Sequence, residues 1–155
     1  MKKEFSNKFT EKGISVENSA IDYISDIRNV FYTKNESSFE NSFMTGTPDI
    51  IYKDSVIDIK SSWDCFTFPI FEVRLNSSYW WQIQGYMHLC DKRYGEVVYV
   101  LMDTDSDEVE DVYSDIDALY RVKSFKVYYD EKAIEEIEGR VVACRDYINY
   151  LMGAI

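Results

Sequence analysis

Residues 46–60 read GTPDIIYKDSVIDIK, and this run predicts a β-hairpin. Its two halves, 49–53 and 55–60, are rich in the β-branched and aromatic residues that favour strands. The polar residues between them are typical of a tight turn. We therefore expect the two halves to pair as neighbouring antiparallel strands.

The hairpin predicts where its charged side chains point. Because side chains alternate along a strand, Asp58 and Lys60 share one face, while Ile57 and Ile59 take the other. Asp49, at the start of the first strand, lies near Asp58 if the register closes at the turn. Two carboxylates and one ammonium would then share a pocket.

Such a pocket favours a divalent cation. Two close carboxylates raise each other's pKa unless a cation neutralises them. Mg²⁺ prefers oxygen ligands and completes its shell with water and substrate phosphate, and a neighbouring lysine can position water or stabilise charge on the phosphate. The alternative is a solvated surface pair of Asp58 and Lys60, but Lys60 ends a run of apolar residues that should be largely buried.

The order of these residues resembles the PD-(D/E)xK nuclease superfamily. Pro48-Asp49 followed by Asp58-Ile59-Lys60 is similar to its signature, and Gln82 with Tyr86 is similar to that of the RecB-like branch. The segment 13–17, GISVE, is similar to the Gly-xxx-Glu of the same branch. The phage-type exonucleases related to lambda exonuclease are the nearest group, and the resemblance covers residues 13–151.

The resemblance implies a role for each matching residue. It implies that Lys60 positions or activates the attacking water. The implied metal ligands are Asp49, Asp58, the Ile59 carbonyl and Glu17, and the residues that orient Lys60 or hold DNA are Gln82 and Tyr86. It implies Mg²⁺, with Mn²⁺ as a substitute. Some RecB-like nucleases carry an iron-sulfur cluster on four cysteines, and the three cysteines here are too few, so no such cluster is expected. From the residues alone, Glu17 could equally serve as a first-turn carboxylate of a helix capped by Ser15.

Apolar periodicity predicts the remaining elements. A first helix from Ser15 carries Val16, Ala20, Ile24, Ile27 and Phe31, and a second helix, capped by Ser77 or Ser78, covers residues 79–90. Residues 95–102 form a buried strand, and residues 122–129 form a strand towards an edge. Asp130 caps a last helix, whose apolar seam is either a lid on the sheet or a subunit contact. The aromatic connection 61–71 either packs or stacks on bases, and Arg74 is a candidate phosphate contact.

The fold class that follows is α/β, with a restriction-endonuclease-like core and a mixed central β-sheet flanked by helices. At 155 residues we expect a single domain over 1–155, with an acidic insert or loop at about 103–117. No membrane segment or signal peptide is expected, so we interpret the protein as cytoplasmic, in a bacterium or a phage-infected cell.

The net charge of −11 is unusual for a DNA-binding protein. Eight of the acids lie at 103–117, which contains no Lys or Arg, so the rest of the chain carries only −3. The sequence thus predicts a metal-dependent DNA nuclease of phage or mobile-element recombination and repair, acting on a duplex end or a single strand, with exonuclease favoured over endonuclease action. A homo-oligomer is a further expectation. The alternative is a non-catalytic nuclease-fold module that binds a protein partner through the acidic segment 103–117.

Overall fold

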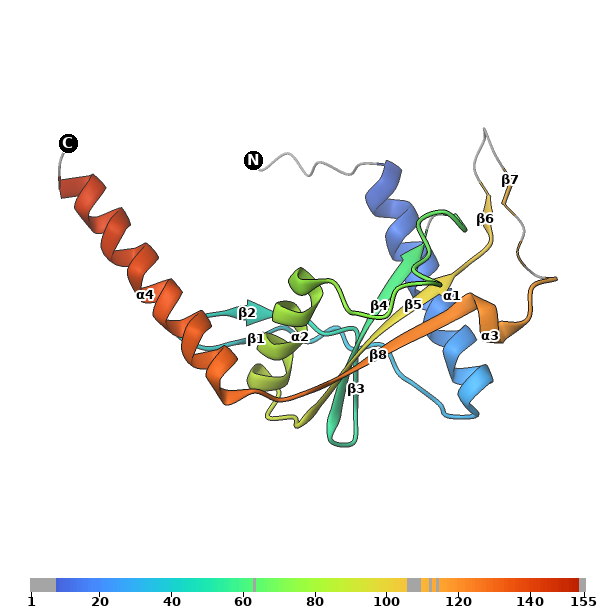
Figure 1. Cartoon of the computed structure of the whole chain (residues 1–155), viewed down its shortest axis with the longest axis horizontal. Helices are drawn as coiled ribbons and strands as arrows, with labels where there is room; N and C mark the ends of the chain where they lie inside the picture. The colour runs from blue at the N-terminus through green and yellow to red at the C-terminus, as the bar shows by residue number, and fades with distance from the viewer. Residues whose placement is uncertain (1–7, 63, 106–109, 112, 114, 154–155) are drawn as a thin grey trace.

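The computed structural model describes residues 8–62, 64–105, 110–111, 113 and 115–153. Four helices and eight strands are defined in these ranges (Figure 1). In chain order they are α1 (Lys8–Arg28), β1 (Phe39–Glu40), β2 (Thr45–Gly46), β3 (Ile50–Tyr52), β4 (Ser55–Ser62), α2 (Ser77–Leu89), β5 (Tyr94–Leu101), β6 (Thr104–Asp105), β7 (Glu110–Asp111), α3 (Ala118–Arg121), β8 (Val122–Tyr128) and α4 (Glu131–Gly153).

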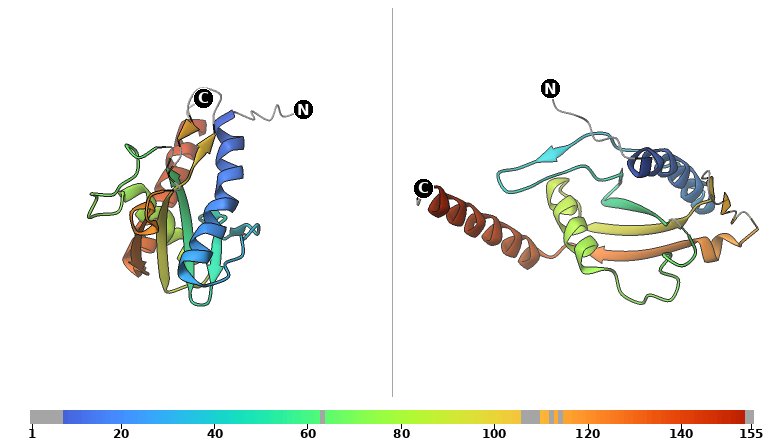
Figure 2. Two further views of the ribbon diagram at one scale, coloured as in Figure 1. Left: turned by 90° about the vertical axis from the view of Figure 1, so that its right-hand side faces the viewer. Right: turned by 90° about the horizontal axis from the view of Figure 1, so that it is seen from above.

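The central sheet is mixed and has the strand order β3-β4-β5-β8. β4 and β5 run parallel and are joined through α2, whereas β3 and β8 are antiparallel to their neighbours. The predicted mixed sheet flanked by helices is therefore confirmed, as is the edge position of β8 (Figure 2).

The predicted hairpin closes in the register that the site requires. Tyr52 pairs with Ser55 and Ile50 with Ile57, so the loop consists of Lys53 and Asp54. Lys53 has a φ of 52°, which turns the chain within those two residues. This pairing places Asp49, just before β3, opposite the middle of β4.

Each face of the sheet is covered by one helix. On the first face, Ile57 and Ile59 of β4 pack with Ala20, Ile21 and Ile24 of α1. On the second face, α2 packs over Val56, Val97 and Val127 through Ile83 and Met87. Asp58 and Lys60 share the second face with Val56, because they alternate with the isoleucines. The candidate site residues of β4 and α2 are thus brought to one side of the sheet.

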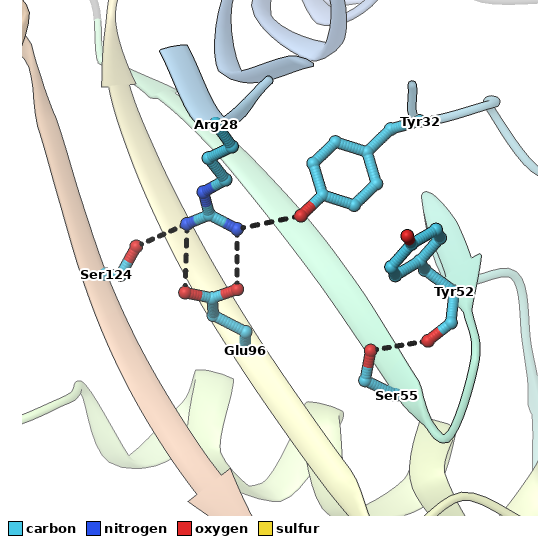
Figure 3. A network of polar contacts seen from close by, with 6 residues as sticks. All are labelled: Arg28, Tyr32, Tyr52, Ser55, Glu96 and Ser124. Atoms are coloured by element: carbon cyan, nitrogen blue, oxygen red, sulfur yellow. Dashed lines mark hydrogen bonds and ion pairs between the residues drawn. The ribbon is translucent and has the colours of Figure 1, made fainter. Parts of the chain in front are cut away.

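Arg28, the last residue of α1, ties that helix to two strands (Figure 3). Its guanidinium donates to both carboxylate oxygens of Glu96 in β5, at 2.8 and 2.9 Å, and to Oγ of Ser124 in β8, at 2.8 Å. A longer contact of 3.5 Å reaches the hydroxyl of Tyr32. This network fixes the end of α1 to strands β5 and β8.

Two predicted helix starts are wrong. α1 begins at Lys8, so Ser15 lies inside the helix and does not cap it. α2 is capped by Asn76, whose side chain accepts from the Ser78 N–H at 2.8 Å, so neither Ser77 nor Ser78 is the cap. Asparagine is among the best N-cap residues, because its carbonyl oxygen reaches the free N–H groups of the first turn. The Asp130 cap of α4 is confirmed, since its carboxylate accepts from the Lys132 N–H at 3.0 Å.

The apolar seam of α1 is also shorter than predicted. Ala20 and Ile24 are buried, but Ile27 is 43% exposed, and Phe31 lies beyond the helix end and is 86% exposed. Ile21 packs in the core together with Ala20 and Ile24, so the buried face of α1 does not extend to Ile27.

α4 does not form a lid on the sheet. Its first turn is buried through Ala133 and Ile134, but the helix then extends away from the sheet (Figures 1 and 2), and Ile148 and Leu151 are exposed. Arg145 donates to the Ser42 carbonyl at 2.6 Å, which anchors the helix to the β1–β2 hairpin. In the described part of the chain, no helix combines the length and apolar character required to cross a bilayer.

The acidic segment contains structure that its composition did not predict. β6 and β7 pair as a short antiparallel hairpin within it. Asp103 accepts from the Tyr113 N–H at 2.6 Å and lies 3.4 Å from the Arg121 guanidinium, and Asp117 caps α3. Six of its positions, 106–109, 112 and 114, fall outside the described residues.

Candidate active site

Asp58 and Lys60 are the centre of the candidate site. Lys60 Nζ lies 2.7 Å from Asp58 Oδ2, and the Asp58 residue is only 3% exposed. Among the described residues, this ammonium is the charged neighbour of Asp58 Oδ2, and no donor meets that oxygen in full hydrogen-bond geometry. A buried carboxylate oxygen in that state has free acceptor capacity.

Asp49 lies beside Asp58, as the hairpin register predicts. Its Oδ2 accepts the backbone N–H of Ile59 at 2.6 Å, which brings this carboxylate into the middle of β4. The Ile59 side chain meanwhile points to the opposite face and packs in the α1 core. The backbone of Ile59 therefore fixes the position of one carboxylate relative to the other.

Burial raises the pKa of both aspartates. For Asp49, burial together with the negative charges of Asp58 and Glu17 raises the pKa to about 7, against the opposing effect of the Ile59 N–H and Lys60. Burial also raises the pKa of Asp58, although the Lys60 ammonium partly offsets this. The pocket thus holds more negative charge than one ammonium neutralises.

Lys60 is held as a cation. Burial alone would lower its pKa, but Asp58 and Asp49 outweigh this, so the pKa of Lys60 is raised. The ammonium also contacts Gln82 Oε1 at 3.2 Å and lies 4.6 Å from the centroid of the Tyr79 ring. These contacts from α2 direct the lysine across the second face of the sheet.

Gln82 and Tyr86 meet Lys60 in a chain of contacts. Because the ammonium only donates, it fixes the carbonyl oxygen of Gln82 towards itself, and Gln82 Nε2 then donates to the Tyr86 hydroxyl at 2.8 Å. Burial raises the pKa of Tyr86, so its hydroxyl keeps its proton at neutral pH. The i, i+4 spacing seen in the sequence is what puts both side chains on the same side of α2.

Glu17 lies near the pocket but has its own partner. Its carboxylate is 2.9 Å from Lys34 Nζ, an ion pair that nothing in the sequence indicated. Its charge still acts on both aspartates, since it contributes to raising the pKa of each.

The donor set fits a Mg²⁺ site with two carboxylates. Within the described ranges, no three acidic, histidine or cysteine side chains stand close enough together to form a metal cluster. Asp49 and Asp58 would therefore hold the ion with a backbone carbonyl, water and substrate, which is the kind of partial protein shell that Mg²⁺ accepts. The unsatisfied Asp58 Oδ2 is the atom that most needs such a partner.

Tyr79 belongs to the site, whereas His88 lies outside it. Sequence reasoning does not identify Tyr79, because its contact with Lys60 depends on how α2 crosses β4. The only signal in the sequence is that Tyr79 lies one helical turn before Gln82. His88, in contrast, lies outside the site: its Nδ1 is 2.9 Å from the Tyr129 hydroxyl, near the end of β8.

Comparison with solved structures places the fold. The phage related exonuclease from Haemophilus somnus 129PT matches with a TM-score of 0.84 and 30% identity, over 99% of this chain and 76% of that one. The alkaline exonuclease (LHK-Exo) from Laribacter hongkongensis matches with a TM-score of 0.68 and 18% identity, over 91% of this chain and 71% of its own. Its complex with dAMP matches with a TM-score of 0.70, also at 18% identity, over 96% and 74%. No protein-family profile matches the chain, and neither does any curated protein.

The chain thus has the α/β fold of the phage-related and alkaline exonucleases. At 30% identity over nearly its whole length, it belongs to the family of the phage related exonuclease from Haemophilus somnus.

Proposed function

We propose that this chain is a Mg²⁺-dependent deoxyribonuclease of the PD-(D/E)xK type, with Mn²⁺ as a substitute. Its role would be that of a phage or mobile-element exonuclease in recombination and repair. Family membership supports the nuclease class. The site supports the chemistry, since it combines two carboxylates, one ammonium and an amide-hydroxyl pair on one face of the sheet.

The state of Asp58 carries this proposal. A buried carboxylate oxygen without an aligned donor is costly to the folded protein. Asp49 and Asp58 would hold a divalent cation, and its binding would offset that cost and displace the proton that burial favours on Asp49. The Ile59 carbonyl completes the protein ligands, and Glu17 adds negative charge behind them.

When bound, the ion would stabilise the charge that develops on the scissile phosphate and lower the pKa of a bound water. Lys60 orients the attacking water and adds positive charge next to the phosphate. Its raised pKa favours this positioning and electrostatic role over that of a general base. Gln82 holds the ammonium in place, and the Tyr86 hydroxyl, with its proton free, donates to a phosphate oxygen of the bound strand.

End-labelled linear DNA incubated with Mg²⁺, Mn²⁺ or EDTA tests the proposal. Cleavage should require metal, fall below detection in Asp58→Ala, and fall about 10²- to 10³-fold in Lys60→Ala. Mn²⁺ binding measured by calorimetry should be lost in Asp58→Ala and retained in Lys60→Ala. Cleavage that survives both substitutions would place the activity elsewhere. A wild type that binds Mn²⁺ but cuts no nucleic acid would support the non-catalytic interaction module instead.

Circular DNA separates the two modes of cleavage. An exonuclease degrades the linear form and leaves a closed circle of the same sequence intact, whereas an endonuclease cuts both. Comparison of the two substrates with the same Mg²⁺ preparation decides which mode applies.

Self-association through α4 is a further part of the proposal. The exposed apolar residues of its outer half, Tyr147, Ile148, Tyr150, Leu151 and Met152, resemble an uncovered packing surface. Light scattering should show an oligomer that Ile148→Glu converts to a monomer. A monomeric wild type at all concentrations would exclude it. A protein partner at 103–117 remains the second proposed contact.

A further inference from the structure

The open edge of β8 borders two neighbouring hollows that share Tyr128 and Tyr129. The first, with a volume of about 560 Å³, lies at the sheet end where α2 finishes and β5 begins. The second, with a volume of about 750 Å³, follows β8 towards Trp80 and the loop before α2. Because a strand edge presents side chains from both faces, residues of either face reach these hollows.

Positive charge gathers along this edge in a chain whose net charge is −11. Lys92 and Arg93 line the first hollow, and Arg74 and Lys126 line the second. Among the described residues, none of these four cations has a carboxylate within ion-pair distance. In contrast, Arg28, Lys34, Lys60, Arg121 and Arg140 are each ion-paired.

Only two acids line the hollows. One is Asp130, whose carboxylate is occupied as the cap of α4. The other is the exposed Asp91. Four cations against these two acids leave the lining of the hollows with a net positive charge, and Glu131 and Glu138 of α4 act on Tyr129 from one side.

Aromatic rings accompany these cations. Tyr94 and Tyr128 form an edge-to-face pair with ring centroids 5.7 Å apart, and they are 48% and 71% exposed. Exposed rings of this kind cost solvation without adding to the core, but they offer flat faces for stacking. Cations beside exposed rings suit a ligand that is both anionic and aromatic.

A row of rings connects this edge to the candidate active site. The Tyr79 ring, over which Lys60 Nζ lies, contacts Tyr99 with centroids 6.1 Å apart, and Tyr99 contacts Phe125 of β8 at 6.0 Å. In the strand register, Lys60 lies opposite Tyr99 and Ser55 lies opposite Tyr94. Five residues of strand, roughly 17 Å, separate these positions, and this odd number places Tyr94 and Tyr128 on the opposite face from Lys60, so a strand that reaches both crosses the β8 edge.

We propose that this edge is a track for single-stranded DNA, leading between the active site and the far end of the sheet. The β8 track consists of Arg74, Lys92, Arg93, Lys126, Phe125, Tyr94 and Tyr128. Its cations contact phosphates and its exposed tyrosines stack on bases, which is how proteins hold single strands without reading sequence. The inference rests on the proposed nuclease function for the identity of the strand.

An extended acidic peptide is the other occupant that this edge could take, as an added strand on β8. The exposed Tyr94 and Tyr128 favour the nucleic acid, because a peptide paired along the edge would use backbone groups and leave these rings without a role. Binding of a single strand and of an acidic peptide to the same edge variants distinguishes these two occupants.

Binding is measured in EDTA, where the proposed cleavage is silent, by fluorescence anisotropy of a labelled single strand of roughly ten nucleotides. Lys126→Glu and Arg93→Glu should each weaken binding about tenfold and reduce the steepness of the salt dependence by about 0.7 or more in log–log slope. Tyr128→Ala should also weaken binding about tenfold. Arg140→Glu, which makes the same change of charge on the exposed face of α4, should bind like the wild type.

Three results with the variants would overturn the track. They are wild-type binding by all the edge variants, an equal loss in Arg140→Glu, and edge variants that keep the strand but lose an acidic peptide. A mononucleotide that competes as well as the strand would also overturn it, since the hollow would then be a nucleotide pocket. Cleavage of a dinucleotide with Mn²⁺ reports on the active site alone. A wild type that binds the strand in EDTA but never cuts it contradicts the proposed function and leaves the track standing.

Discussion

Gly46 of β2 lies flat against the ring of Tyr86 in α2. A Cβ atom at position 46 would come within 2.5 Å of Tyr86 Cε1 and 2.8 Å of Cδ1, distances that real Cβ atoms do not adopt. The same tyrosine carries the hydroxyl that meets Gln82. The short β1–β2 hairpin therefore packs against Tyr86, the last residue in the chain of contacts that runs from Lys60 through Gln82.

Gly46→Ala should lower the cleavage rate about tenfold or more with little change in stability. The new methyl group displaces the Tyr86 ring, so Gln82 loses its partner and Lys60 is held less well, and small misplacements of catalytic groups have large effects on rate. Single-turnover cleavage and thermal unfolding of the same preparation measure the two quantities.

Two other glycines serve as controls for Gly46→Ala. A Cβ at Gly139 of α4 meets nothing within 4 Å, so Gly139→Ala should leave cleavage unchanged and stabilise the helix by about 0.5–1 kcal/mol. A Cβ at Gly95 would lie 2.6 Å from Ile83 Cγ1 in the core, so Gly95→Ala should lower stability by about 1–3 kcal/mol. Full activity in Gly46→Ala would show that displacement of the Tyr86 ring does not affect cleavage.

Tyr86→Phe should reduce cleavage by a smaller factor than Gln82→Ala. The phenylalanine keeps the ring packed but removes the acceptor of Gln82 Nε2, whereas Gln82→Ala removes the contact with Lys60 itself. We expect losses of about tenfold and about a hundredfold, mainly in kcat, because both act on the orientation of Lys60. Tyr120→Phe, at a tyrosine of α3 that is 57% exposed, is the matched control and should have no effect. Equal losses in Tyr86→Phe and Gln82→Ala would mean that the contact of the Tyr86 hydroxyl with the phosphate outweighs its support of Gln82.

The local parts of this site follow from sequence, and the non-local parts do not. Strand alternation predicted the shared face of Asp58 and Lys60, and the helical spacing predicted that of Gln82 and Tyr86. The approach of Asp49 depended on a register that only the turn at Lys53 decides. The pairing of Glu17 with Lys34 and the packing of Gly46 on Tyr86 join elements whose relative position no periodicity encodes.

The helix starts show the same limit. Several serine, asparagine or aspartate residues near a helix start can each act as its cap, and propensity alone does not distinguish them. The sequence therefore predicted caps at Ser15 and Ser77, whereas α1 begins at Lys8 and α2 is capped by Asn76. For α4, the apolar seam predicted a packed face correctly only over its first turn. The direction in which α4 leaves β8 decides whether its outer half packs on the sheet, and here it extends away from the sheet.

Asp49→Asn should stabilise the metal-free protein at alkaline pH. The pKa of Asp49 is raised to about 7, whereas an unfolded aspartate titrates near 3.9, so the folded state binds the proton more tightly. Stability is therefore full below about pH 4 and is lost as the pH rises through about 7. The asparagine has no proton to lose, and its carbonyl oxygen still accepts the Ile59 N–H.

Denaturant unfolding in EDTA measures this effect. Asp49→Asn should exceed the wild type by about 2 kcal/mol near pH 8, and the difference should shrink towards zero only below about pH 4. With Mn²⁺ the order should reverse, because only the wild type keeps both carboxylates for the ion. Asp146→Asn on α4 is the control and should follow the wild type throughout. A difference that does not vary with pH would show that Asp49 titrates normally.

Arg28→Ala should destabilise the protein by about 2 kcal/mol without a matching loss in cleavage. Its paired contact with Glu96 and its bond to Ser124 join α1 to β5 and β8 (Figure 3), and the two charged side chains are 24% and 14% exposed. Charge-assisted hydrogen bonds of this kind contribute more than neutral ones, and removal of the arginine leaves the Glu96 carboxylate partly buried without its partner.

Arg140→Ala offers the comparison for this ion pair. Arg140 and Glu136 lie one turn apart on α4 at 2.7 Å, but their side chains are 77% and 47% exposed, so water screens the attraction and its loss should cost less than about 0.5 kcal/mol. Arg28→Lys should recover only part of the stability, because an ammonium cannot donate to both oxygens of Glu96 and to Ser124 in the same planar arrangement. Thermal unfolding of the three variants tests this order. Equal losses in Arg28→Ala and Arg140→Ala would mean that α1 is held on the sheet by its apolar contacts alone, with Ala20, Ile21 and Ile24 sufficient to fix its end.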